Sequence, residues 1–447
     1  MARSVTPPRG MRDFLPLEKA RREQVLGVIR RVYSSRGFDE IETPVMEDAA
    51  RLHSGLGGDN EKLAFGVLKR GLTEDDLHAA SDPLELTDLG LRFDLTVPLT
   101  RFYATHRAAL PAVFRSIQIA PVWRAERPQR GRYRQFVQCD IDIIGEAGPV
   151  AEVELITATA AALRELGLGG CSIRINDRRL LAGMLAALGF APADHPSVLI
   201  TVDKLDKVGA DGVIAELRER GVEEHAVDAL RDFLEGSSAP VPSAPVPSDA
   251  AAPSDVSAPS AAAPSFGADA IASALPDGVD RELVSALADL GGAVLAADPT
   301  VEVVFDPFLV RGMGYYTGTI FEIQHPDFPG ALGGGGRYDG MVGRLLGVEV
   351  PAAGFSIGFE RILELVSTSG TGQTDALALV YDPGVPPARL VALQAELVSA
   401  GMRVRLERRP RNMKPLLEQL AAAGYARTAS VTDRTGSAAD LDIRPLR

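Results

Sequence analysis

The most chemically suggestive part of the chain is a short run of arginines. In a protein with a formal net charge of −13, eleven successive residues hold five of them: Arg124, Arg127, Arg130, Arg132 and Arg134. An arginine fork binds phosphate or carboxylate oxygens through two parallel hydrogen bonds and keeps its charge at any relevant pH. Arg124 follows the apolar segment "IAPVW", where a charged group costs free energy unless it meets an anion. We therefore expect an anion site at Arg124.

The last three arginines of this run surround Gly131 in a polar loop that also contains Pro128. Basic loops of this kind suit contacts to a nucleic-acid backbone, which position a protein without reading sequence. A solvated loop tip with surface ion pairs to Glu126 is the alternative. Short motifs of this kind often arise by chance, so both interpretations stay open on the residues alone.

A group of polar residues follows directly. Gln138, Asp140 and Asp142 alternate with apolar residues, so they share one face of their expected strand. Asp94 and Thr96 show the same spacing, on what we expect to be a second strand. Two carboxylate sites beside arginines can hold a small zwitterion, one taking its ammonium group and the other an N–H-bearing side chain. Carboxylates that neutralise structural lysines are the alternative.

Two further arginines lie far away in the sequence. Arg311 precedes small residues and the tyrosine pair Tyr315 and Tyr316. Arg361 follows Gly358 in the expected first turn of a helix, where the helix dipole disfavours a cation. An anionic ligand would explain Arg361, and so would a salt bridge to a neighbouring acid.

The run Gly333 to Gly336 matches neither the Walker A pattern nor the GxGxxG spacing of a dinucleotide site. We interpret it as a close approach of the backbone in a strand or turn beside a ligand.

Strands and helices must position these residues. Residues 17–38 have the apolar periodicity of a helix, and residues 39–48 resemble a strand that Pro44 interrupts. Two strands around the arginine loop predict a long antiparallel hairpin. The other expected elements are a strand entering a helix (91–106), a helix (149–170), a strand (308–324), a glycine-rich turn (332–347), a strand entering a helix (352–366) and a tail that alternates strand and helix from 376 onward.

Length and composition limit the possible classes. A chain of 447 residues predicts two or three domains. We expect neither a signal peptide nor a membrane span, because no apolar run is long enough. With Cys139 and Cys171 as the only cysteines, we expect no disulfide framework, no metal site and a cytoplasmic location. The tail from Ala376 has eleven basic and seven acidic residues, which favours it as a polyanion contact.

These patterns predict an α+β protein. Residues 236–266 are rich in Ala, Pro and Ser and are expected to form a disordered linker, since they have too little apolar surface to offset their ordering entropy. The expected divisions are 1–170 as the first part of a catalytic core, 171–296 as an inserted domain that includes the linker, 297–370 as the second part of the core, and 376–447 as a small α/β domain.

The motifs, in their order, resemble those of the histidyl-tRNA synthetases, a family of class II aminoacyl-tRNA synthetases. They are "RGMRDFLP", "GFDEIETPVME", "VWRAERPQRGRYRQFVQCDIDIIG", "LVRGMGYYTGTIFE", "GGGGRYDG" and "AAGFSIGFERIL". The resemblance implies an antiparallel catalytic sheet of six or seven strands flanked by helices, an inserted small domain and an anticodon-binding-like C-terminal domain in a shortened form. It also implies a homodimer built around the Pro44 region.

The resemblance further implies roles for individual residues. It assigns adenylation to Arg124, Arg311 and Arg361, and ATP binding to Arg124, Glu126 and Arg361. It assigns histidine binding to Asp94, Thr96, Gln138, Asp142, Arg311, Tyr315, Tyr316 and Tyr338. It assigns tRNA contact to Arg130, Arg132 and Arg134. The sequence departs from the family pattern where Asp94 and Asp142 replace the Glu of many bacterial members, and where Gly314 replaces an Asp.

The implied activity is that of a histidine–tRNA ligase, which uses ATP and Mg²⁺ to activate L-histidine and transfers it to tRNA(His). Two alternatives are a non-catalytic regulatory subunit of ATP phosphoribosyltransferase that resembles these synthetases, and a tRNA-independent amino-acid ligase. The presence of all three adenylation arginines and of a tail domain argues against the regulatory subunit.

Overall fold

The computed structural model describes residues 5–54, 58–129, 131–236, 241–242, 266–311, 314–367 and 376–446. Arg130 and most of the linker expected at 236–266 lie outside the described residues. The chain divides into two compact units. One comprises residues 5–12 and 28–366 and is built on a large sheet, and the other comprises residues 13–27 and 367–446 and is built on a small sheet formed by residues 376–446.

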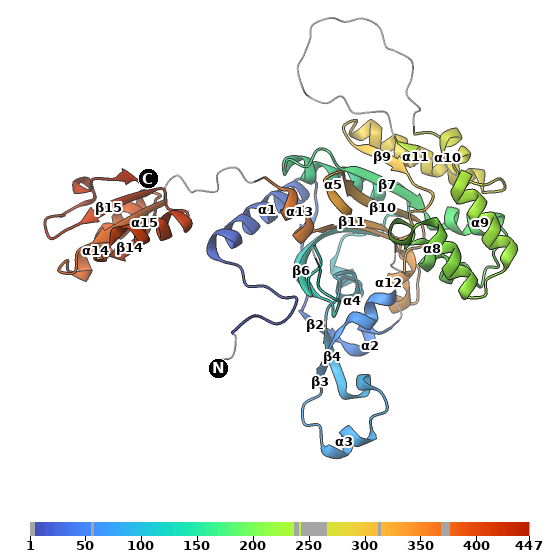
Figure 1. The fold of residues 1–447 in the computed structure, drawn as a ribbon, viewed down its shortest axis with the longest axis horizontal. Coiled ribbons are helices and arrows are strands. Elements are labelled where there is room, and N and C mark those ends of the chain that lie inside the picture. Colours follow the sequence, from blue (N-terminus) through green and yellow to red (C-terminus); the bar gives the residue numbers. More distant parts are fainter. Residues whose placement is uncertain are drawn as a thin grey trace, which may run out of the picture. The chain divides into compact units, whose positions relative to one another are not determined.

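The large sheet carries the arginine hairpin near one edge (Figure 1). Its nine described strands run in the order β1 (Asp39–Glu40), β5 (Phe114–Trp123), β6 (Gln135–Ile144), β12 (Ala352–Gly358), β11 (Phe328–Arg337), β10 (Thr319–His325), β7 (Ser172–Asp177), β9 (Glu302–Phe305) and β8 (Val241–Pro242). The six strands from β5 to β7 are antiparallel, whereas β1 pairs with β5 and β9 pairs with β7 in parallel. This confirms the expected α+β class with a mainly antiparallel sheet.

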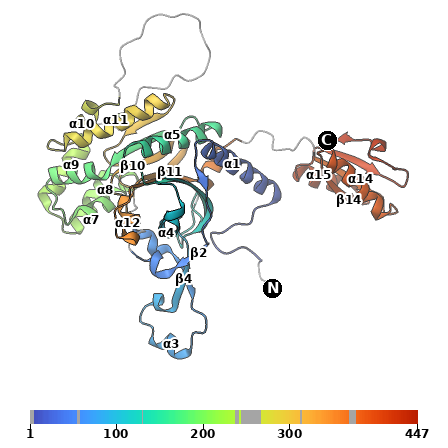
Figure 2. The ribbon, with the colours of Figure 1, turned by 180° about the vertical axis from the view of Figure 1, so that it is seen from behind.

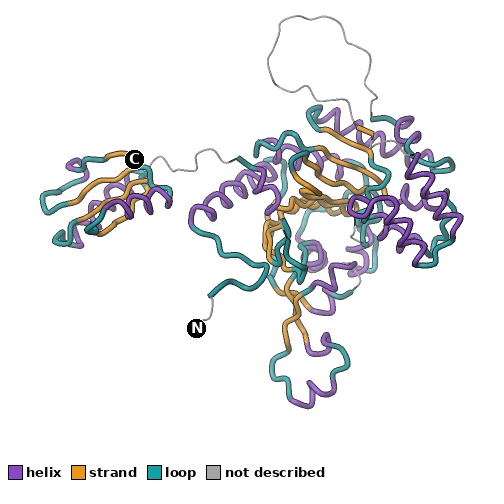
Figure 3. Tube along the Cα trace, viewed as in Figure 1, coloured by secondary structure: helices purple, strands orange, loops and turns teal. Residues whose placement is uncertain are grey.

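Helices surround this sheet, as the contrast of orange strands and purple helices in Figure 3 shows. They are the part of α1 (Pro16–Ser34) from residue 28 onward, α4 (Thr96–His106), α5 (Val150–Glu165), α6 (Arg178–Ala187), α11 (Arg281–Ala297), α12 (Asp339–Leu346) and α13 (Phe359–Leu365). Helix α5 packs on β6 and β12, and α11 packs on α5 and α6. The view from behind in Figure 2 shows α5 and α11 on the same side of the sheet.

Four helices form a lobe beside β7 and β10: α7 (His195–Val202), α8 (Leu205–Glu219), α9 (Glu224–Gly236) and α10 (Ala268–Ser273). The strand at the start of the expected insertion, β7, belongs to the large sheet, where it pairs with β10. The limits of the inserted domain remain a proposal.

Pro44 separates two strands that we expected to be one interrupted strand. β1 joins the large sheet, whereas β2 (Met46–Asp48) pairs with β4 (Thr87–Leu91), which also pairs with β3 (Phe65–Leu68). Proline has no N–H group to donate to a sheet, so the chain changes partner at this position. The arm around these strands includes α2 (Ala49–Leu52), α3 (Glu74–Ala79) and the short 3₁₀ helices Gly58–Leu63 and Pro83–Leu86. A third short 3₁₀ helix, Arg107–Ala109, follows α4.

The strand expected at 308–324 and the turn expected at 332–347 were both partly wrong. Arg311 has a left-handed backbone with φ of 59°, and the described strand of this segment, β10, begins at Thr319. Residues 312–313 lie outside the described residues. The four glycines form part of β11, between β10 and β12. A Cβ atom on Gly335 would lie 1.9 Å from the carbonyl oxygen of Gly354 on β12. The glycines therefore permit close strand packing rather than a turn.

The second unit alternates strand and helix as expected. Its elements are β13 (Ala376–Tyr381), α14 (Pro387–Ser399), β14 (Arg403–Arg408), α15 (Met413–Ala422), β15 (Arg427–Val431), a 3₁₀ helix (Ala438–Asp440) and β16 (Arg444–Pro445). The strand order is β14-β13-β15-β16, with β16 antiparallel to β15 and the other pairs parallel.

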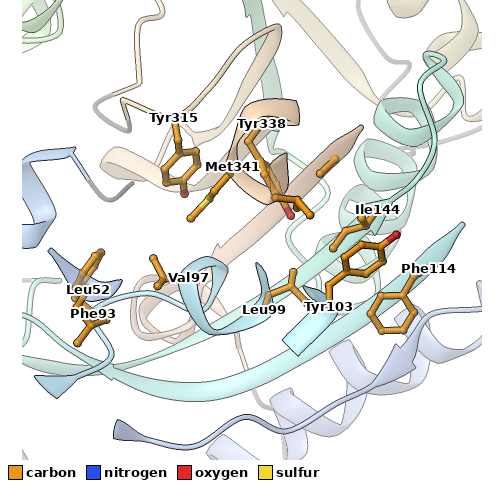
Figure 4. Packing of buried hydrophobic residues seen from close by; sticks show 12 residues of the cluster. Leu52, Phe93, Val97, Leu99, Tyr103, Phe114, Ile144, Tyr315, Tyr338 and Met341 are labelled. Carbon is orange, nitrogen blue, oxygen red and sulfur yellow. The ribbon is translucent and has the colours of Figure 1, made fainter. Parts of the chain in front are cut away.

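An apolar cluster supports one side of the candidate site (Figure 4). Phe93, Val97 and Met341 pack in the same cluster as Tyr315 and Tyr338, whose hydroxyl groups give this core a polar edge. The rings of these two tyrosines are thus fixed by burial in the core.

Candidate active site

A cavity of about 1380 Å³ lies against the large sheet, between the hairpin β5–β6, strands β10 to β12 and the start of α13. All the sequence-predicted site residues that the structure describes line it, apart from Arg134: Asp94, Thr96, Arg124, Glu126, Arg132, Gln138, Asp142, Arg311, Tyr315, Tyr316, Tyr338 and Arg361. Segments more than two hundred residues apart in sequence thus meet at one site, and the roles of these residues remain proposals.

One end of the cavity, which we term the arginine end, contains Arg124, Arg132 and Arg361. The Arg124 Nε donates to the carbonyl oxygen of Phe93 over 2.9 Å, and its guanidinium lies 5.1 Å from the centre of the Phe136 ring. Arg361 donates to the carbonyl oxygens of Gly131 and Ala331. The hydrogen-bond partners of Arg124 and Arg361 are thus neutral, and both guanidinium groups line the cavity.

The electrostatics of Arg361 suit the binding of a polyanion. Burial lowers the pKa of its guanidinium, and the positive charges of Arg132 and Arg311 lower it further. The hydrogen bonds of Arg361 go to carbonyl groups, so the salt bridge considered as an alternative does not explain its position. An arriving phosphate chain would relieve the repulsion among these cations.

The neighbouring residues have structural partners. Glu360 accepts from Arg12 over 3.1 Å and from the backbone N–H of Val137 over 3.4 Å. The Arg134 Nε donates to the carbonyl oxygen of Glu126 over 3.0 Å, so this side chain stabilises the hairpin itself. The Glu126 carboxylate lies 3.7 Å from Arg132.

Arg311 lies on the sheet floor between the two ends. Its Nη1 donates to Glu322 of β10 over 2.9 Å. A Cβ atom on Gly334 would lie 2.5 Å from the Arg311 Cζ, so the guanidinium rests where a side chain would otherwise be. Burial alone would lower the pKa of Arg311, but the charge and hydrogen bond of Glu322 outweigh burial and raise it.

The opposite end, which we term the carboxylate end, contains Asp94, Asp140 and Asp142. One oxygen of Asp94 accepts from the backbone N–H of Val97 over 3.2 Å, and the other is buried without a hydrogen-bond partner. The prediction that Asp94 and Thr96 lie on a strand was wrong, because Asp94 precedes α4 and Thr96 begins it. They nevertheless line the same cavity as the strand β6 residues.

Burial raises the pKa of all three carboxyl groups in this end. The pKa of Asp142 rises to about 7, against the opposing effect of the Tyr338 hydroxyl, which donates to Asp142 over 2.7 Å. The charge of Asp142 adds to burial in raising the pKa of Asp140. Gln138 donates to Asp140 and Ser356, which leaves its own buried oxygen without a partner. A cationic ligand would relieve this repulsion and occupy these acceptors.

Three tyrosines separate the carboxylate end from the apolar core. The Tyr315 ring meets Tyr316 edge-on at 4.9 Å and Tyr338 edge-on at 5.9 Å, and its hydroxyl lies 3.5 Å from Thr96 Oγ1. Burial is the main cause that raises the pKa of each hydroxyl, so these hydroxyls stay neutral donors at physiological pH.

The sequence analysis did not identify three residues that shape the site: Glu322, Arg12 and Gly354. A Cβ atom on Gly354 would lie 2.0 Å from an oxygen of Asp142, so this glycine makes room for the carboxylate. The alternation of Gly354 with larger residues along β12 was a usable signal. No signal in the sequence pointed to the pairing of Arg12 with Glu360, because 348 positions separate the two residues.

Comparisons with known proteins identify the group to which this fold and cavity belong. The model of the family described as histidyl-tRNA synthetase matches residues 10–362. A histidine–tRNA ligase of Leifsonia xyli subsp. xyli is 57% identical over 449 residues, which cover 100% of this chain and 99% of that protein. The chain belongs to the histidyl-tRNA synthetase family. This confirms the family and the enzyme class expected from the motifs.

Solved structures show the same fold. A histidyl-tRNA synthetase from Nostoc sp. PCC 7120 superposes with a TM-score of 0.71 at 25% identity, over 99% of this chain and 95% of that one. A Bacillus halodurans structure titled as an ATP phosphoribosyltransferase regulatory subunit/histidyl-tRNA synthetase has a TM-score of 0.72 at 18% identity, over 97% and 100% of the two chains. At that identity the second match shows the fold alone.

The described residues include no helix that is long and apolar enough to span a membrane. They contain no group of three or more His, Cys, Asp or Glu residues placed to hold a metal ion.

Proposed function

We propose that this synthetase family member activates L-histidine with Mg²⁺–ATP and transfers it to tRNA(His). The observation that carries the proposal is the polarity of the cavity. At its arginine end, Arg124 and Arg361 donate to neutral carbonyl groups, and its carboxylate end holds buried acids with unused acceptor atoms. A nucleotide and an amino acid complement these two ends, with the two reacting groups between them.

In the first step, a carboxylate oxygen of histidine attacks the α-phosphorus of ATP and pyrophosphate leaves. Both reactants are anions, so catalysis depends on positive charge where negative charge develops. Arg124 and Arg311 would stabilise the α-phosphate, and Arg361 would hold the γ-phosphate. Glu126 would accept from the adenine amino group.

The amino acid would lie with its ammonium group at Asp94, Thr96 and Gln138. Asp142, Tyr315, Tyr316 and Tyr338 would recognise the imidazole ring, since a carboxylate and a hydroxyl can satisfy its two nitrogens. Mg²⁺ would arrive bound to the phosphates of ATP. Phosphate oxygens and water molecules commonly supply most of the ligands of this ion in nucleotide sites.

In the second step, a hydroxyl of the terminal tRNA ribose attacks the carbonyl carbon of the adenylate, and AMP leaves. The loop with Arg130, Arg132 and Arg134 would meet the acceptor end. In the second unit, Arg403 and Arg405 lie 4.8 Å and 5.9 Å from the ring centre of Tyr425. Tyr425 is buried, whereas both arginines are exposed. The basic surface that they form supports a role of that unit in binding the anticodon region.

We also propose a cytoplasmic homodimer built around Pro44. Val45 and Met46, which follow Pro44, are 41% and 47% exposed despite their apolar side chains. An apolar surface at this position suits a subunit interface.

Amino-acid-dependent exchange of pyrophosphate into ATP tests the proposal most directly. We expect exchange with histidine and Mg²⁺ but not with the other standard amino acids. Lack of exchange with histidine would refute adenylation and favour a regulatory role. Charging of tRNA(His) by the same preparation tests the second step, and exchange without charging would favour the tRNA-independent ligase.

A further inference from the structure

Glu322 joins two arginines on the cavity floor. It lies on β10 opposite Arg174 of β7 in the sheet register. Its Oε2 lies 2.9 Å from Arg311 Nη1, and its Oε1 lies 3.5 Å from Arg174 Nη1. Arg174 also forms an ion pair with Asp306, which follows β9. The four charges therefore alternate in the order Asp306, Arg174, Glu322, Arg311.

This row is largely removed from solvent. The exposed fraction of its side chains rises from 2% at Asp306 through 10% at Arg174 and 16% at Glu322 to 20% at Arg311. Charges in such surroundings are weakly screened, and loss of one partner leaves the other uncompensated. The row thus holds its members in place more firmly than a surface ion pair would.

The contacts of Arg311 show what remains available to a ligand. Its left-handed backbone is rare for a side chain of this size, so the main chain is held in a specific conformation. The guanidinium rests over Gly334, and Glu322 binds its Nη1. Its Nε is buried without a hydrogen-bond partner. One part of the fork is therefore anchored, and another donor remains unused.

We propose that Glu322 is the positioning residue for Arg311, and that Arg174 and Asp306 hold Glu322 in turn. This inference rests on the proposed adenylation and deepens it. Because Glu322 binds Nη1 of Arg311, it aligns the guanidinium while the rest of the fork stays available to a ligand. The α-phosphate then meets an arginine that is already oriented, which avoids reorganisation during the attack.

The variant Glu322→Gln tests the inference, because it keeps the shape and removes the charge. We expect kcat for histidine-dependent exchange to fall about 10- to 100-fold, the range for loss of a charged hydrogen bond. The KM values for histidine and ATP should stay within about twofold, because the contacts that bind both substrates before the reaction are unchanged. Glu302→Gln, on the neighbouring strand β9 and outside the cavity lining, is the matched control and should retain the wild-type kcat.

A double-mutant cycle separates positioning from an independent effect. Single-turnover adenylate formation is measured for Arg311→Ala, Glu322→Gln and the double variant. If Glu322 acts through Arg311, the double variant should be as slow as Arg311→Ala alone. A further slowing equal to that of the single Glu322 variant would overturn the inference, and so would a raised histidine KM with unchanged kcat.

Glu322→Asp provides a second route if the Gln variant does not fold. It keeps the charge on a shorter arm, so we expect an intermediate kcat with the same KM values. Wild-type kcat in this variant would contradict the inference. If the wild-type protein shows no histidine-dependent exchange, the proposed function fails. If it is active and Glu322→Gln matches it, this inference alone fails.

Discussion

The two ends of the cavity place charge in opposite ways. At the arginine end, Arg124 and Arg361 hydrogen-bond to neutral backbone carbonyls, and their cationic character persists. At the carboxylate end, Asp94, Asp140 and Asp142 are buried close together, and their pKa values rise. The arginines of the first end keep their charge while Arg124 and Arg361 hydrogen-bond to neutral groups, whereas burial at the second end suppresses part of the charge of its carboxyl groups. An active site can therefore prepare for a polyanion and for a cation by two different physical means.

The largest expected effect on the rate of adenylation comes from removing the positive charge of Arg311, which lies between the two ends. Arg311→Ala should slow adenylation about 10²- to 10³-fold, by analogy with loss of one donor to a developing oxyanion. Histidine affinity should stay within about threefold, because the carboxylate end is untouched. Exchange kinetics and calorimetric titration with histidine measure the two effects. Arg281→Ala, at the exposed start of α11, is the control, and an Arg311→Ala rate close to that of this control would refute the assigned role.

A smaller effect is expected from crowding the carboxylate end alone. In Gly354→Ala, the new methyl group would lie 2.0 Å from an Asp142 oxygen, so the carboxylate or β12 must move. Such overpacking costs about 1–3 kcal/mol, which corresponds to about a 5- to 150-fold rise in histidine KM. The ATP KM should change little. Gly340→Ala is the control, since its nearest neighbour would be 3.9 Å away. A larger rise in ATP KM than in histidine KM would contradict the division into two ends.

The smallest effect concerns pH. The folded protein raises the pKa of Asp142 from 3.8 to about 7, so the native state binds its proton more tightly than the unfolded state. The contribution of this protonation to the free energy of unfolding is fully present below about pH 4, and it is lost as the pH rises through about 7. The melting temperature of the ligand-free protein should fall between pH 5 and pH 8, and it should fall less in Asp142→Asn.

Asp94 and Asp140 titrate in the same end and remain in this variant. Because the charge of Asp142 raises the pKa of Asp140, the difference between the two proteins reports the titration of Asp142 together with its effect on Asp140. We expect a difference of about 1–2 kcal/mol in the pH-dependent part of the unfolding free energy. Parallel pH profiles for the two proteins would show that Asp142 is ionised in the ligand-free fold, and the contrast between the ends would then weaken.

The sequence predicted the hairpin, the strand-to-helix step at Gly358 and the tail, because periodicity and turn residues act locally. It also identified the arginines and Asp142, since charged residues in apolar strands require a partner. It failed where one local signal has two structural outcomes. Glycines 333–336 have a turn-like composition, yet they form a central strand because neighbouring strands exclude side chains. Glu322 was missed because its role depends on Arg174, 148 positions earlier, and on a sheet register that no local pattern encodes.

The glycine strand has a consequence for how this protein can change over generations. At Gly333, Gly334, Gly335 and Gly336, a Cβ atom would lie within 2.7 Å of a backbone oxygen or of the Arg311 guanidinium. Every change in the first or second base of a glycine codon introduces such an atom or a stop. Four neighbouring codons can thus vary only at their silent third base, which makes the floor of the cavity one of the least evolvable parts of the molecule.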